Sequence, residues 1–221
     1  MFPSLPITPF SILTAFGFVL ASFLFWRALK DDFPEEEILT LTLWLALGGL
    51  LASRLVYLIF HYQFFWQNPL ALIFWSKYPG FSLLGGFLGI GGVLGIWGKK
   101  REWDIWLTLD KLADPLLLMV ILSSVGAWLG NKEIYSLGLV VLGILGILGK
   151  RFYLGKYRSF AFYPSGKVGF IGLASTILFF SLILPLDFYK KSVLSLEAVG
   201  DLVIILVSLG LLYKRSGRKI R

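Results

Sequence analysis

The chain has 221 residues, of which 57% are hydrophobic and only 15% charged, and its formal net charge is +8. Soluble domains carry about 25% charged residues, so this composition excludes an ordinary soluble domain and predicts an all-α integral membrane protein. The chain has no cysteine and one histidine, which excludes disulfides and multi-histidine metal sites, so we expect neither metal nor cofactor. Basic and aromatic residues do not interleave on a polar surface, so membrane lipid is the expected partner and nucleic acid is not.

Seven apolar segments predict a seven-span helical bundle that forms one transmembrane domain over residues 1–221. We expect the first to be a retained span, because it lacks a basic leading region and an acidic run follows it. The fifth is short, and if it failed to cross, the last two spans would reverse. We expect an interfacial aromatic segment over 61–79 and a basic loop over 150–167. The predicted spans are 9–29, 38–60, 80–98, 105–130, 134–149, 168–186 and 196–213.

The distribution of lysine and arginine predicts the orientation. With the N-terminus outside, 15 of the 21 basic residues flank the inner ends of spans, and four lie in outer loops. Basic residues are enriched on the cytoplasmic side of membrane proteins. The sequence therefore predicts an N-out, C-in topology with a basic cytoplasmic tail.

Glycines mark the third span. Gly85, Gly89 and Gly92 recur at spacings of four and three, with Gly86 beside them. These spacings place glycines along one side of a helix, where almost no side chain covers the backbone. In a bilayer such a surface admits another helix or an acyl chain, and the spacing alone leaves both alternatives open.

Arg54 is the most informative charge within a span, since a buried arginine is costly in a bilayer. One interpretation is structural: the side chain extends toward the end of its helix or pairs with an acid such as Asp114. The other is functional, because the planar guanidinium suits the phosphate of an anionic lipid. Tyr57 follows one turn later and would reach the same headgroup.

A second set of charges lies in the fourth span. Asp110, Lys111 and Asp114 are expected to form a polar network inside the bundle, or to include a partner for a basic residue elsewhere. Pro115 is expected to kink this helix. His61, at the end of the second span, is read either as an interfacial residue or as a candidate general base.

Three segments resemble sequence motifs of one protein family. Residues 52–57, Ala-Ser-Arg-Leu-Val-Tyr, are similar to Gly-Ala-Arg-Leu-Gly-Tyr. Residues 80–89, Gly-Phe-Ser-Leu-Leu-Gly-Gly-Phe-Leu-Gly, are similar to Gly-Met-Ser-Phe-His-Gly-Gly-Leu-Leu-Gly. Residues 124–129, Ser-Val-Gly-Ala-Trp-Leu, are similar to Arg-Ile-Gly-Asn-Phe-Ile. Over roughly residues 7–135 the chain thus resembles the prolipoprotein diacylglyceryl transferases.

The resemblance implies a seven-span protein of the bacterial inner membrane. It implies transfer of a diacylglyceryl group from phosphatidylglycerol to the cysteine of a lipoprotein precursor, with those two molecules as partners. The family's outer head domain, between its fourth and fifth spans, has no room here. The lipid-binding residues that the resemblance implies are Arg54, Tyr57, Ser82, Gly85 and Gly86.

Departures from the family motifs favour an alternative to the transferase function. Leu84 stands where the family has a histidine considered important for catalysis, and Ser124 and Ala127 replace its signature arginine and asparagine. Phe10 stands where the first span normally has a tyrosine. The alternative is a non-catalytic membrane protein that binds anionic lipid or a membrane partner. A small transporter is a third reading, although Asp201 in the last span comes without a pair of repeat-related broken helices.

Overall fold

The computed structural model describes residues 8–67, 80–132, 134–156, 168–190 and 195–216. Within these residues the regular structure is all helical, as predicted. Seven of the described helices have 19 to 27 residues, and α3 has six. Their bounds are α1 Pro9–Leu29, α2 Glu35–Phe60, α3 Tyr62–Gln67, α4 Leu83–Arg101, α5 Ile105–Asn131, α6 Ile134–Lys156, α7 Phe170–Lys190 and α8 Leu196–Ser216.

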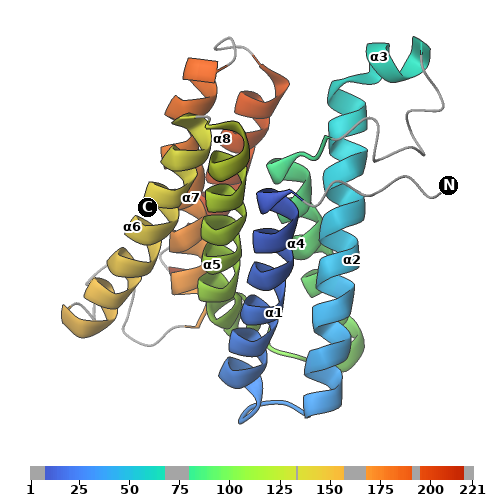
Figure 1. Cartoon of the computed structure of the whole chain (residues 1–221). Coiled ribbons are helices and arrows are strands. Elements are labelled where there is room, and N and C mark those ends of the chain that lie inside the picture. The colour runs from blue at the N-terminus through green and yellow to red at the C-terminus, as the bar shows by residue number, and fades with distance from the viewer. Residues whose placement is uncertain (1–7, 68–79, 133, 157–167, 191–194, 217–221) are drawn as a thin grey trace, which may run out of the picture.

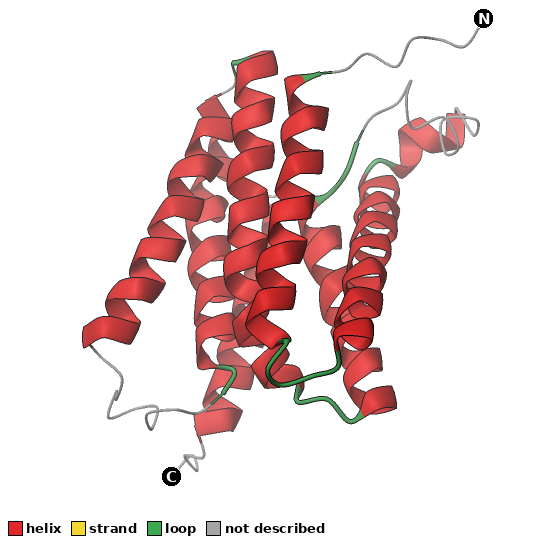
Figure 2. Cartoon of the chain, turned by 60° about the horizontal axis from the view of Figure 1, so that its bottom comes forward, coloured by secondary structure: helices red, strands yellow, loops and turns green. Residues whose placement is uncertain are grey.

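The long helices run back and forth along one direction (Figure 1), so α1 begins and α8 ends at opposite ends of the bundle (Figure 2). Figure 2 shows the same arrangement from another side. We call the end where α1, α4, α6 and α8 begin the upper end, and the end where α2, α5 and α7 begin the lower end. The upper end also carries α3.

Five helices of the described chain are long and apolar enough to cross a membrane: α1, α2, α5, most of α6 and α8. The apolar part of α7 is shorter, covering Phe170–Pro185. The glycine-rich α4 is outside this group, because its glycines and its terminal Lys99 and Lys100 lower its hydropathy. Membrane character is therefore clear, and the expected seven helices are present in the described residues.

The predicted start of the basic loop was wrong. The helix expected to end at residue 149 continues to Lys156, so residues 150–156 are helical. Lys150, the first residue of this added part, binds α5, where its Nζ lies 2.8 Å from the Asp114 carboxylate. Residues 62–67 of the expected interfacial segment form α3, and residues 68–79 lie outside the described part.

The helices pack in two groups. α2 and α4 form a close pair, and α5 packs against α1, α6 and α7, with α8 on α7. One apolar core, around Phe25, Leu41 and Leu94, joins α1, α2, α4 and α5 toward the lower end. A second core, around Leu84, Leu117 and Phe180, joins α4, α5, α6 and α7. The groups therefore meet mainly around α4.

Candidate functional site

Arg54 is buried inside the bundle, with 3% of its surface exposed. It lies six residues before the end of α2, and its Nη1 donates a hydrogen bond of 2.8 Å to the Gly80 carbonyl. Its guanidinium carbon lies 5.4–5.8 Å from three ring centroids, those of Tyr57, Phe65 and Phe81. The side chain thus extends toward the upper end. The alternative pairing with Asp114 was wrong, since that carboxylate binds Lys150 on α6.

The turn before α4 is fastened to α2 by backbone and hydroxyl groups. The Ser82 N–H donates to the Ser53 carbonyl over 3.1 Å, and the Ser53 hydroxyl donates to the Ser82 carbonyl over 2.8 Å. The Ser82 hydroxyl accepts the Gly85 N–H and caps α4. Gly80 lies so close to the Tyr57 ring that a Cβ there would overlap it. We call Ser53, Arg54, Tyr57, Gly80 and Ser82 the upper cluster.

The glycines of α4 divide between two faces. A Cβ on Gly85 would lie 2.5 Å from the Ala52 carbonyl oxygen, and one on Gly89 would overlap the Gly48 carbonyl, so both positions pack on α2. Gly86 has more room, with its nearest neighbour 3.9 Å away. Gly92 meets nothing within 4 Å, so it departs from the predicted continuous side. Gly85 and Gly89 therefore allow α4 to pack closely on α2.

Two of the motif departures are buried. Leu84, 7% exposed, belongs to the second core, and a Cβ added to Gly200 of α8 would lie 2.5 Å from its Cδ2 atom. Ser124 is buried on α5. Two residues on, Gly126 packs against the backbone of Phe10 in α1. Leu84 thus forms part of the contact between α4 and α8 at the upper end.

His61 is exposed at the C-terminal end of α2, beside the upper cluster. Its Nδ1 lies 3.0 Å from the Tyr57 carbonyl oxygen, and its ring stacks on the Tyr57 ring at 4.2 Å. The structure therefore brings His61 to the aromatic residues around Arg54, on the outside of that group.

The acids of α5 do not form the single network that was predicted. Asp110 accepts the Gly169 and Gly172 N–H groups over 2.6 and 2.7 Å, which satisfies the start of α7. Asp114 binds Lys150 of α6. The Lys111 side chain is half-buried, and the ion pair expected for it with Asp114 is formed by Lys150 instead. These residues lie toward the lower end, away from the upper cluster.

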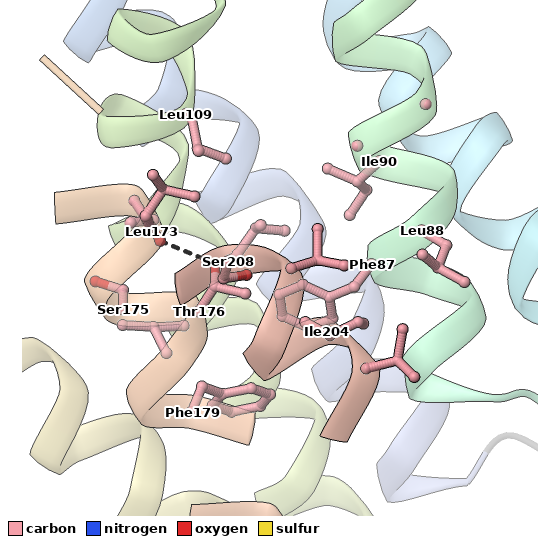
Figure 3. A pocket seen from close by; sticks show the side chains of 18 residues that line it. Phe87, Leu88, Ile90, Leu109, Leu173, Ser175, Thr176, Phe179, Ile204 and Ser208 are labelled. Carbon is pink, nitrogen blue, oxygen red and sulfur yellow. Dashed lines mark hydrogen bonds between the residues drawn. The ribbon is translucent and has the colours of Figure 1, made fainter. Parts of the chain in front are cut away.

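An apolar cavity of about 360 Å³ lies between α4, α5, α7 and α8, as Figure 3 shows. Sequence patterns did not predict it, since it arises where four helices meet. Its volume is in the range of ligand pockets, and on α4 its lining begins one turn below Leu84. Residues that line it include Phe87, Ile90 and Gly91 of α4, Leu109 and Ala113 of α5, Thr176 and Phe179 of α7, and Ile204 and Ser208 of α8.

Sequence reasoning also missed the surroundings of two charged residues of α8. Asp201 of α8 was noted only as a charge in the last span, yet it is 3% exposed. Arg215 donates to the Val168 carbonyl over 2.6 Å and lies 4.5 Å from the Trp106 ring centroid. Among the described residues no three His, Cys, Asp or Glu side chains gather as a metal site.

Comparisons with known proteins all point to one family. The model of the prolipoprotein diacylglyceryl transferase family matches residues 1–138. A phosphatidylglycerol–prolipoprotein diacylglyceryl transferase of Shouchella clausii is 26% identical over 130 residues, which cover 58% of this chain and 46% of that protein.

Enzymes of the same name show similar likeness. The one from Enterococcus faecalis is 27% identical over 135 residues, covering 60% of this chain and 47% of that protein. The one from Limosilactobacillus reuteri is 29% identical over 124 residues, covering 55% and 43%. In each case the match spans about half the length of the curated relative or slightly less.

Proposed function

The chain belongs to the prolipoprotein diacylglyceryl transferase family, and from this membership we propose that it transfers a diacylglyceryl group from phosphatidylglycerol to the cysteine of a lipoprotein precursor. The reaction forms a bond between the cysteine sulfur and a glyceryl carbon. The bond from that carbon to the phosphate oxygen breaks, and glycerol phosphate leaves with the electron pair. The thiol proton must pass to a base, because a thiol with a pKa of about 8.5 is mostly protonated at neutral pH.

Two features together carry the proposal. One is a buried arginine beside the turn that begins α4, and the other is an apolar cavity that α4 lines further down. Arg54 lies beside the turn at Gly80, and the cavity begins one turn below Leu84. A phospholipid needs both kinds of surface, a cation for its phosphate and an apolar space for its chains.

In this proposal the lipid phosphate replaces the Gly80 carbonyl as the acceptor for Arg54, and one acyl chain occupies the cavity. Tyr57 and Ser82 supply hydroxyl groups beside the phosphate. Gly85 and Gly86 both face α2, where an added Cβ would lie 2.5 Å and 3.9 Å from its nearest atom, so in this proposal they hold α4 against α2 beside the phosphate. Planar guanidinium donors match phosphate oxygens better than an ammonium does.

We also propose that the upper end faces outward across a bacterial cytoplasmic membrane. Many of the described basic side chains lie at the lower end, the side where lysine and arginine are enriched in membrane proteins. Because the chain has no cysteine, single cysteines at Asn131 and Arg151 test the orientation. Only Asn131→Cys should react with an impermeant thiol reagent added to intact cells. The described basic residues of the lower end are Arg27, Lys30, Lys99, Lys100, Arg101, Lys150, Arg151, Lys214 and Arg215.

The full chain in phosphatidylglycerol vesicles, with a peptide that carries a lipoprotein-type cysteine, tests the function. We expect release of glycerol phosphate that depends on the peptide and falls at least about 100-fold in Arg54→Ala, since an arginine–phosphate contact is charge-assisted. Arg151→Ala, an exposed arginine at the lower end, is the matched control and should keep its rate.

A second function is favoured by Leu84, an apolar side chain packed into the core at the family's histidine position. In it the protein retains anionic lipid without turnover. Native mass spectrometry distinguishes the two: lipid retention that Arg54→Ala abolishes, without peptide-dependent release, supports the non-catalytic function and contradicts the transferase.

A further inference from the structure

Asp201 is a carboxylate buried within α8 that the proposed site does not yet use. It is the sixth residue of that helix and is 3% exposed. At 1.5 Å per residue it lies about 7.5 Å from the upper end of α8. Placing a carboxylate inside a transmembrane bundle is costly, and such residues commonly mark functional positions.

The helical spacing of α8 directs Asp201 to the side where the cavity lies. Asp201, Ile204 and Ser208 are three and four residues apart, so they share one face of the helix. Ile204 and Ser208 line the cavity, and Figure 3 shows both at its α8 wall. Asp201 therefore stands one turn above the cavity on the same face.

The residue next to Asp201 touches the position that departs from the family motif. Gly200 lies against Leu84, with a distance of 2.5 Å from an added Cβ to the leucine Cδ2. The motif that residues 80–89 resemble has a histidine at this point, whereas leucine cannot accept a proton. Asp201 therefore directly follows the residue of α8 that packs on this position.

Asp201 and Arg54 are also close in the chain to residues that pack on the first turn of α4. Arg54 lies two residues before Val56, and Asp201 directly follows Gly200. α4 begins between their two helices, because Val56 of α2 packs on Gly85 while Gly200 of α8 packs on Leu84. A cation and a carboxylate thus lie on either side of the first turn of α4.

We propose that Asp201 accepts the proton of the acceptor thiol, in place of a histidine on α4; this inference rests on the proposed transferase function. The S–H proton moves to the carboxylate as the sulfur bonds to the glyceryl carbon. The bond to phosphate oxygen breaks, and glycerol phosphate carries away the electron pair. The proton then leaves the carboxylate for solvent.

The isosteric variant Asp201→Asn tests the role, because it keeps the shape and removes the proton acceptor. Proton transfer by a positioned group contributes about 100- to 10,000-fold, so we expect the peptide-dependent rate to fall at least about 100-fold. Lipid retention and thermal unfolding should stay close to wild type. Ser136→Ala, a buried polar position on α6 outside the cavity lining, is the control and should change the rate less than threefold.

Two readouts separate a proton acceptor from a merely structural acid. The residual rate of Asp201→Asn should rise about tenfold per pH unit below pH 8.5, following the thiolate fraction in solution. Adding Leu84→His to Asp201→Asn should restore at least tenfold of the lost rate, since it returns a base to α4. A structural role predicts neither the pH slope nor the rescue.

The outcomes distinguish this inference from the function on which it rests. An inactive wild type overturns the transferase function and this role with it. An active wild type whose rate Asp201→Asn leaves intact overturns only the role of Asp201. Loss of rate accompanied by equal losses of lipid retention and thermal stability also overturns it, because the carboxylate would then be structural.

Discussion

Glycines on the two faces of α4 have opposite effects on packing. On one face Gly85 and Gly89 bring the backbone of α2 into direct contact, with no space for a side chain. On the other face Gly91 meets nothing within 4 Å and lines the cavity. A missing side chain therefore permits close packing where another helix arrives and leaves a hollow where none does.

The difference shows how one helix can form both a close helix contact and one wall of an apolar cavity. Close α2–α4 packing fixes the upper cluster, because Ser53 and Ser82 exchange hydrogen bonds across the pair. The opposite face stays open beside α5, α7 and α8. The same substitution at positions on the two faces should therefore have different consequences.

Gly89→Leu should give the largest effect. Its side chain would meet the Gly48 backbone, which cannot move without separating α2 from α4. We expect a loss of about 3 kcal/mol of stability, seen as a fall in the unfolding temperature of about 6–12 °C. Thermal unfolding in detergent measures it, and an unchanged temperature would contradict the packing described for this face.

Gly91→Leu, the same change on the opposite face, should spare the fold and fill part of the cavity. We expect the unfolding temperature to fall by less than about 3 °C. Retention of phosphatidylglycerol should weaken about tenfold, equivalent to about 1.4 kcal/mol. Native mass spectrometry of the purified protein measures the retained lipid, and full retention would show that the cavity does not hold the chain.

Gly86→Ala should have the smallest effect, and it should raise the unfolding temperature rather than lower it. The nearest atoms to an added Cβ are 3.9 and 4.0 Å away, which is ordinary contact. Because alanine favours a helix over glycine by about 1 kcal/mol, we expect the unfolding temperature to rise by about 2–4 °C. A marked decrease would mean that α2 and α4 approach more closely than described.

Much of the upper cluster was predictable from local patterns. The spacing of Arg54 and Tyr57 placed both on one turn of α2, and the residues before α4 formed a recognisable turn motif. The structure brings these elements together at one end. Partners of the charged residues in α5 were not predictable, since Asp110 and Asp114 bind groups that follow them in the chain by at least 36 residues.

The sequence by itself determined the helical class and the family, because long apolar segments need satisfied backbone hydrogen bonds in lipid and the motif order survives over the first half of the chain. Only the tertiary structure decided which glycines pack, where the cavity opens and that Gly200 of α8 packs on Leu84. The physical reason is that helical periodicity fixes the angle of a residue about its own helix axis. The identity of the facing helix depends on how all the helices pack together.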